Sequence, residues 1–263
     1  MNAPLTVQQL LPELDHSHLD WLEEEAIFIL RETVAAFERP ALLFSGGKDS
    51  LVMLKCAEKA FGTKASGGGI PYPLLMIDTG HNFPEVTDFR DFRAKELGAE
   101  LIVRNVEDSM ARGTVRLAHP GESRNVHQSV TLLEAIEEFG FDALIGGARR
   151  DEEPARSKER VFSVRSAGHR WDPRTQRPEF WNLYNTRKNP GESIRVFPLS
   201  NWTELDIWQY IYRENIPVVP LYFAKLRPVV VRPEMIMMVD DERCQLSPGE
   251  EIQIRKVRFR ALG

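Results

Sequence analysis

The hexapeptide SGGKDS at residues 45–50 combines residue types that bind phosphate. Its glycines let the backbone approach an anion closely, its lysine is a compact cation, and its serine hydroxyls can donate hydrogen bonds. An apolar run at 41–44 precedes it and a helix-prone stretch at 51–60 follows. Because unpaired N–H groups at a helix start attract anions, we expect a nucleotide phosphate site here. The alternative is a capped helix start without a ligand.

The spacing of this motif excludes a Walker A loop. That loop has the pattern GxxxxGK followed by Ser or Thr, whereas Lys48 is followed by Asp49 and no four-residue spacer separates the glycines. SGGKDS instead resembles the PP-loop of the adenine nucleotide alpha-hydrolase-like family. The resemblance implies that the chain binds ATP and cleaves it between the α and β phosphates, with pyrophosphate leaving as a unit.

Further motifs narrow the resemblance. DTGHNFPE at 78–85 resembles an element shared by 3'-phosphoadenylylsulfate reductases and by the small, nucleotide-binding subunit of bacterial heterodimeric ATP sulfurylase. GGARRDEEPARSKER at 146–160 and FPLSNWTELDIWQYI at 197–211 resemble the ATP sulfurylase subunit. The reductases carry a catalytic cysteine in a C-terminal Cys-Gly-type motif, which is absent here, and Cys244 is interpreted as a structural or incidental thiol. Family members continue beyond Gly263, so we expect a further C-terminal tail.

The resemblance implies adenylyl transfer from ATP to sulfate, giving adenosine 5'-phosphosulfate and pyrophosphate. Sulfate is already a dianion and needs no general base, so catalysis has to come from preorganised cations and N–H donors. The resemblance also implies Mg²⁺ bound through the phosphates and a separate GTPase subunit whose GTP hydrolysis drives the reaction. The alternatives are a PP-loop phosphoadenylylsulfate reductase relative, a PP-loop amide or thiolation ligase, and a nucleotide-sensing module without turnover.

From these motifs we assign candidate site residues and expect no metal held by protein side chains. The catalytic candidates, of which the arginines are assigned to sulfate and the α phosphate, are Lys48, Arg149, Arg150 and Arg156. The β and γ phosphates are assigned to Ser45, Gly46, Gly47, Lys48, Asp49 and Ser50. The adenosine end is assigned to Asp78, Thr79, Gly80, Gly146 and Gly147.

Several carboxylates, a histidine and two tryptophans near these motifs have two interpretations. Asp49 could act on a metal indirectly or interact with the helix dipole. The group Asp151, Glu152 and Glu153 could hold magnesium, but positioning of the arginines or capping of a helix is favoured. His81 could approach the nucleotide or serve a local hydrogen bond. Trp202 and Trp208 are interpreted as core residues rather than as stacking partners of adenine.

The segment from 149 to 195 is basic inside an acidic chain. It holds ten arginines and two lysines against seven carboxylates, whereas the whole chain has a formal charge of −5. Arginine suits directional hydrogen bonding to phosphate or sulfate oxygens, so we expect anions to bind here. The alternative, for the outer portion at 170–188, is a solvated basic loop.

The elements that position these residues alternate along the chain. Apolar patterns predict helices at 19–37, 50–61, 84–97 and 129–139 and strands at 41–44, 74–77, 101–103 and 143–145. The alternation predicts an α/β fold with an open, mostly parallel sheet, helices on both faces and ligands at the carboxyl ends of the strands. Thr203 is the predicted N-cap of another helix, with Asp206 three residues later.

The sequence divides into three segments. We expect an N-terminal arm at 1–17, a PP-loop domain at 18–215 and a less regular C-terminal extension at 216–263. Within the extension, the residues at 252–260 alternate between apolar and basic and could form an edge strand or a docking surface. Either this region or the proline-rich part at 216–233 could dock the GTPase subunit.

Nothing in the sequence indicates a membrane, secretion or nucleic acid. No apolar stretch approaches the ~20 residues that span a bilayer, and the N-terminus lacks a secretory signal pattern. The net negative charge argues against a general nucleic-acid binder. Cys56 and Cys244 are far apart, and we expect both to be free thiols in a reducing cytoplasm.

Overall fold

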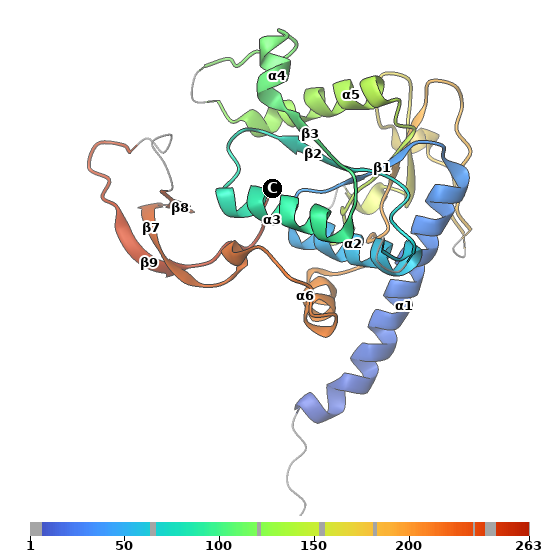
Figure 1. The fold of residues 1–263 in the computed structure, drawn as a ribbon, viewed down its shortest axis with the longest axis horizontal. Helices are drawn as coiled ribbons and strands as arrows, with labels where there is room; N and C mark the ends of the chain where they lie inside the picture. The colour runs from blue at the N-terminus through green and yellow to red at the C-terminus, as the bar shows by residue number, and fades with distance from the viewer. Residues whose placement is uncertain are drawn as a thin grey trace, which may run out of the picture.

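The short apolar runs of the sequence become the strands of a six-stranded sheet (Figure 1). Its strand order is β3-β2-β1-β4-β6-β5, and all neighbours are parallel except β5 and β6. The strands are β1 Pro40–Leu43, β2 Leu74–Asp78, β3 Leu101–Asn105, β4 Ala143–Ile145, β5 Phe162–Arg165 and β6 Ser193–Val196. This is a computed structural model that describes residues 7–63, 67–119, 122–152, 156–180, 183–233, 235–239 and 246–262, with side chains from residue 18.

Helices cover both faces of this sheet. They are α1 Val7–Ala36, α2 Lys48–Phe61, α3 Pro84–Leu97, α4 Val106–Ala111, α5 Gln128–Phe139 and α6 Glu204–Arg213. Short 3₁₀ helices are η2 Arg124–His127, η3 Arg156–Lys158, η4 Pro173–Thr175 and η5 Pro220–Tyr222. No helix in the described ranges is both long enough and apolar enough to cross a membrane.

The core lies on the two faces of the central strands. Ala41, Leu75 and Leu144 pack with residues of α5 on one face, whereas Leu42 and Leu74 pack with residues of α1, α2 and α6 on the other. Neighbouring residues of a strand thus enter opposite core layers, as the period of two in a strand requires. Burial on both faces explains why these strands read as continuous apolar runs.

The C-terminal extension forms a separate three-stranded antiparallel sheet with the order β8-β7-β9. Its strands are β7 Lys225–Arg232, β8 Met235–Met238 and β9 Gln253–Val257. It projects from the α/β body as an arm, and the chain then returns so that its C-terminal end lies beside α3 (Figure 1). Of the two interpretations of 252–260, the edge strand is present as β9, which pairs only with β7 among the described strands.

The predicted fold class is confirmed, and the element bounds differ in places. The prediction omitted β5 and β6, which flank the part at 170–188 that could be a solvated loop; both strands pair within the main sheet. The first helix begins at Val7 rather than at residue 19, so it runs through the expected domain boundary at residue 18. Residues 1–6 of the expected arm lie outside the described residues.

Candidate active site

The SGGKDS segment forms the turn between β1 and α2, as its sequence context predicts. Gly46 has a φ of +75°, a conformation that favours glycine, and Gly47 is the N-cap of α2. The Ser50 hydroxyl donates to the Gly47 carbonyl at 2.8 Å, and the Ser45 hydroxyl accepts from the Gly47 N–H at 3.3 Å. These bonds fix a turn that directs the positive end of α2 toward the carboxyl ends of the sheet strands.

A row of alternating charges begins at this turn. The ammonium group of Lys48, which is only 5% exposed, lies 3.1 Å from Asp49 Oδ2. Asp49 Oδ1 accepts from Arg149 Nε at 2.7 Å, and Arg149 Nη1 donates to Asp151 Oδ1 at 2.5 Å. Both oxygens of Asp49 therefore contact cations. Asp49 orients Lys48 and Arg149, which are buried beside the turn.

Asp151 connects this row to α6. Its second oxygen, Oδ2, accepts from the backbone N–H of Glu204, the first residue of α6, at 2.9 Å. The interpretation that this carboxylate positions an arginine and caps a helix is confirmed. Glu152 Oε2 lies 3.6 Å from Arg156 Nε. Glu153 lies outside the described residues. In the described ranges, no three His, Cys, Asp or Glu side chains form a group that could hold a metal ion.

A cavity of about 560 Å³ opens beside the turn, within the size range of ligand pockets. It lies where β1 and β4 end, which is where the strand order reverses and α/β sheets bind ligands. Gly147 brings the strand end against α2, since a Cβ there would lie 3.2 Å from Asp49 Cβ. The polar lining comes from three segments and consists of Ser45, Lys48, Asp49, Ser50, Asn125, Gln128, Ser129, Gly146, Gly147, Glu152 and Arg156.

The three candidate arginines have different positions. Arg156 lines the cavity, and Arg149 lies behind it in the charge row, only 4% exposed. Arg150 points elsewhere: its Nη1 donates to Asn201 Oδ1 at 2.5 Å. Elsewhere in the basic segment at 149–195, Arg165, Arg174 and Arg177 pair with the nearby carboxylates Glu159, Asp172 and Glu192. Of the three candidates, Arg156 lines the cavity, Arg149 contacts the turn through Asp49, and Arg150 does neither.

The DTG segment forms a second turn, after β2. Asp78 Oδ1 accepts from the Gly80 N–H at 2.7 Å and from Asn82 Nδ2 at 2.8 Å, and Gly80 has a φ of +73°. Thr79 lines an adjoining cavity of about 320 Å³ that shares Ser45, Met76, Ile77, Asn125, Gln128, Ala261 and Leu262 with the larger one. Asp78 and Gly80 line neither cavity and shape the turn instead. His81 lines the smaller cavity, and its backbone N–H donates to Thr79 Oγ1 at 3.2 Å.

The sequence analysis missed several lining residues. Asn125 and Gln128 line both cavities, and Gln128 Nε2 donates to Asn125 Oδ1 at 3.2 Å. Phe197, Ala261 and Leu262 also contribute. No local pattern could reveal them, because only the crossover through α5 and the return of the C-terminal segment bring them to the turn.

The two tryptophans belong to the core, as the sequence analysis favoured. Trp202 is 1% exposed and packs edge-on against Tyr210 with 5.1 Å between ring centroids. Trp208 packs in the same way on Tyr222 at 5.2 Å. Neither lines the cavities. Cys56 is a buried free thiol, and burial raises its pKa to about 12; Cys244 lies outside the described residues.

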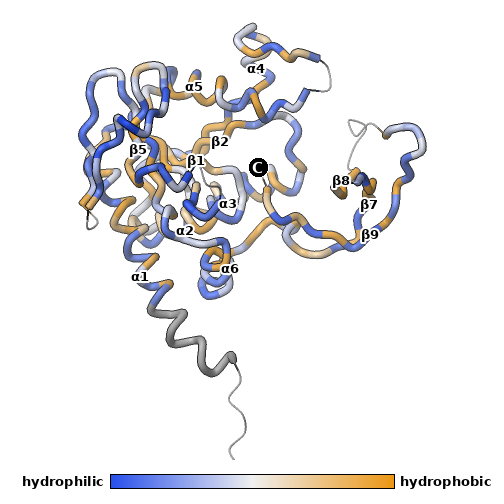
Figure 2. Tube along the Cα trace, turned by 180° about the vertical axis from the view of Figure 1, so that it is seen from behind, coloured by the Kyte–Doolittle hydropathy of each residue, from blue (hydrophilic) through white to orange (hydrophobic). Residues whose placement is uncertain are grey.

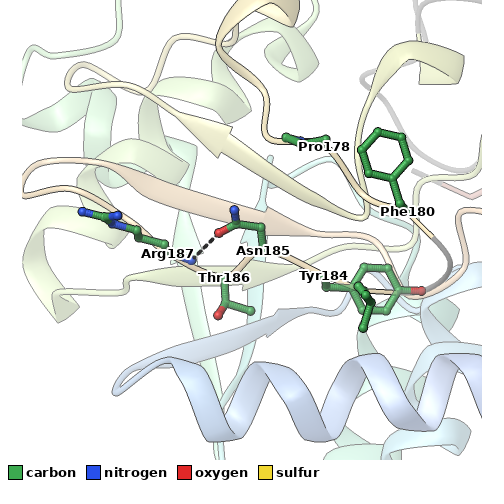
Figure 3. A pocket seen from close by; sticks show the side chains of 7 residues that line it. Pro178, Phe180, Tyr184, Asn185, Thr186 and Arg187 are labelled. Atoms are coloured by element: carbon green, nitrogen blue, oxygen red, sulfur yellow. Dashed lines mark hydrogen bonds between the residues drawn. The ribbon is translucent and has the colours of Figure 1, made fainter.

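A surface hollow of about 480 Å³ lies in the connection between β5 and β6 (Figure 3). Tyr184 forms part of it and packs on Phe162 with ring centroids 5.3 Å apart. The backbone N–H of Arg187 donates to Asn185 Oδ1 at 3.2 Å, so the polar groups there bond locally (Figure 3). No residue of the SGGKDS turn lines this hollow, which separates it from the candidate active site.

The sheet order and the turn at its reversal point define a nucleotide-binding α/β protein of the PP-loop class. Residues 39–263 match the family model of the phosphoadenosine phosphosulfate reductase domain. An ATP complex of the FMN adenylyltransferase from Candida glabrata has a similar fold, with a TM-score of 0.52 at 16% identity, covering 88% of this chain and 68% of that one.

Comparison with curated relatives identifies the family of the chain within this class. Sulfate adenylyltransferase subunit 2 of Citrifermentans bemidjiense is 55% identical over 94% of this chain and 81% of its own length. The protein of that name from Methylobacterium radiotolerans is 56% identical over 94% of this chain and 76% of its own length. The chain belongs to the sulfate adenylyltransferase subunit 2 family.

Proposed function

We propose that this chain transfers the adenylyl group of ATP to sulfate, forming adenosine 5'-phosphosulfate and pyrophosphate. The observation that carries the proposal is the row Lys48, Asp49 and Arg149 at the start of α2, beside a cavity of about 560 Å³ that Arg156 also lines. The membership of the chain in the sulfate adenylyltransferase subunit 2 family supports the same reaction.

In the proposed step, a sulfate oxygen forms a bond to the α phosphorus, and the bond from that phosphorus to the bridging oxygen breaks. Pyrophosphate leaves with the electron pair. Lys48 and the N–H groups of the SGGKDS turn stabilise the charge that grows on pyrophosphate. Arg156 holds the incoming sulfate in line, which reduces the entropic part of the barrier. The apolar Leu75, Leu132 and Phe197 provide a surface for adenine in the same cavity.

Mg²⁺ fits this proposal as an ion bound through the β and γ phosphates. The only acidic group of the turn, Asp49, already contacts Arg149 and Lys48 through its two oxygens. The protein would therefore hold the ion through the triphosphate rather than through a carboxylate cluster. When bound there, Mg²⁺ neutralises phosphate charge.

The test of the reaction is formation of adenosine 5'-phosphosulfate from ATP, Mg²⁺ and sulfate, with and without a GTPase partner. Lys48→Ala should abolish the product, since removing one group that stabilises the developing charge costs about 2.7–4 kcal/mol. Lys55→Ala is the control: it lies on the same helix and pairs with Glu58 at 3.4 Å. Equal turnover of the two variants would contradict the phosphate role of Lys48, and product formation only with an amine or tRNA would favour a ligase.

We propose in addition that a GTPase subunit docks on the arm and drives the reaction in the cytoplasm. The two segments that the sequence offered for docking are one surface, because Pro228 of β7 pairs with Ile254 of β9. Hydrophobic residues run along the arm (Figure 2), and Leu226 and Ile254 are 67% and 65% exposed. Lys256, opposite Leu226, adds a basic group to the same face. Exposed apolar patches of this kind mark interaction sites.

Point substitutions test this docking better than a deletion of residues 250–263, which would also remove residues that line the cavity. Leu226→Asp combined with Ile254→Asp should abolish co-purification with the GTPase subunit. Leu183→Asp is the matched control, because Leu183 is 72% exposed and belongs to the connection between β5 and β6. Retention of the partner by the double variant would exclude the arm as its docking surface.

A further inference from the structure

A buried tyrosine contacts the phosphate-binding turn from behind. Tyr222, at the end of η5, is 5% exposed. Its hydroxyl accepts a hydrogen bond at 2.9 Å from the backbone N–H of Lys48, the first residue of α2. Leu262 packs against the apolar cluster to which the Tyr222 ring belongs. Tyr222 therefore contacts both the start of α2 and the C-terminal segment, although these residues are far apart in sequence.

The tyrosine ring is fixed by its packing. It lies edge-on to Trp208 of α6, with 5.2 Å between centroids, and belongs to an apolar cluster with Val86, Val219 and Leu221. Val86 also contacts the turn, since a Cβ on Gly46 would lie 3.5 Å from it. A side chain held on several sides cannot follow the turn if the turn moves. Its hydroxyl is therefore a fixed reference point for the Lys48 amide.

The C-terminal segment 259–262 lies against the other side of this contact. The Phe259 N–H donates to the Leu221 carbonyl at 2.9 Å, and Arg260 pairs with Glu204 at 2.8 Å. A Cβ on Gly47 would lie only 2.9 Å from the Leu262 carbonyl oxygen, so the segment 259–262 is packed closely against the turn. Ala261 and Leu262 line both cavities.

We propose that Tyr222 is a positioning residue for the pyrophosphate part of the substrate. By accepting the Lys48 N–H, its hydroxyl fixes the first peptide of α2, and so sets the direction of the adjoining N–H groups and of the Lys48 side chain. Its ring packs in the cluster that Phe259 and Leu262 contact, and so holds the segment 259–262 as a wall of the same site. Tyr222 does not line either cavity, so it acts through the turn and not on the substrate. This inference rests on the proposed function.

The experiment compares Tyr222→Phe with Tyr210→Phe in the full chain. Both tyrosines pack edge-on against a tryptophan of the α6 region, at 5.2 and 5.1 Å, but the Tyr210 hydroxyl bonds to Glu23 at 2.7 Å, away from the turn. Calorimetry should show that Tyr222→Phe binds ATP and inorganic pyrophosphate about 3–10-fold more weakly, as expected for one hydrogen bond. Its affinity for AMP should be unchanged. Tyr210→Phe should bind all three ligands like the wild type.

Unchanged ATP and pyrophosphate affinity in Tyr222→Phe, or an equal loss for AMP, would overturn the positioning role. Wild-type chain that binds pyrophosphate and ATP but forms no adenosine 5'-phosphosulfate would contradict the proposed reaction instead, and the two failures are thus distinguishable.

Discussion

At the scale of single residues, charge compensation explains how cations are buried beside the SGGKDS turn. Lys48 and Arg149 are 5% and 4% exposed, and burial of an unpaired charge is costly. Asp49 lies between them and contacts both, and Asp151 balances the second contact of Arg149. Because the row alternates in sign, cations stay in place before a triphosphate arrives. Such preorganisation is what electrostatic catalysis requires.

Loss of Arg149 should therefore destabilise the chain as well as impair activity. Removing one partner of a buried ion pair costs about 3–5 kcal/mol, and the partial exposure of Asp49 and Asp151 reduces the expected loss for Arg149→Leu to about 2–3 kcal/mol. Urea unfolding measures this difference. The neighbour Arg150, which bonds Asn201, provides the control: Arg150→Leu should lose less than about 1 kcal/mol. Equal losses would show that the charge row contributes little to stability.

Cys56 should be unreactive in the folded chain. Burial raises the pKa of its thiol to about 12, and the thiolate is the nucleophile, so at pH 8 almost no reactive form exists. Iodoacetamide followed by peptide mass analysis should leave Cys56 unmodified in the native chain and modify it fully in urea. Rapid native alkylation would show that this region opens.

At the scale of elements, the N-terminus of α6 is connected to the candidate site, because it contacts the charge row through Asp151. Thr203 and Asp206 form a capping box, in which each side chain accepts from the backbone N–H of the other residue. The Glu204 N–H is satisfied by Asp151. The start of α6 thus depends on local capping and on a long-range contact to the loop that holds Arg149.

Removal of the cap should loosen this element. Thr203→Ala should lower the free energy of unfolding by about 1 kcal/mol, the usual cost of a lost N-cap. Thr203→Ser keeps the hydroxyl and should stay close to the wild type. Chemical denaturation of the three proteins decides the point, and identical midpoints for Ala and Ser would indicate that the cap hydroxyl contributes no stability.

At the scale of the whole molecule, one ligand would join segments from the entire chain. The larger cavity takes lining residues from the β1–α2 turn, α5, the loop after β4 and the C-terminal segment. The C-terminal segment follows β9 of the arm, so the proposed partner on the arm and a nucleotide in the cavity would contact connected segments of the chain. A bound nucleotide should stabilise all of these segments together.

ATP should accordingly stabilise the wild-type chain against unfolding. At a ligand concentration of about 100 times Kd, mass action gives a stabilisation of about 2.7 kcal/mol. The unfolding temperature should rise with ATP concentration in thermal scans. Lys48→Ala should show little rise at the same concentrations, while Lys55→Ala should behave like the wild type. A rise of equal size in Lys48→Ala would place the triphosphate away from the turn.

The sequence by itself determined the glycine turn between β1 and α2, the parallel sheet and the family. These follow from local rules: a buried strand is a short apolar run, a tight turn needs glycine, and a helix start exposes N–H groups. Asp151 lies two residues from the arginine that it holds, so that pairing was readable locally, whereas the helix that it caps begins at Glu204, far along the chain.

The tertiary structure alone decided which distant residues meet at the turn. Arg149 and Arg150 are adjacent in sequence, yet only Arg149 reaches Asp49. Gln128 and Leu262 enter the cavity walls, and Tyr222 reaches the Lys48 amide, only because the chain crosses over the sheet and the C-terminal segment folds back. These tertiary contacts depend on packing between segments that are far apart in the chain, and local residue patterns do not predict that packing.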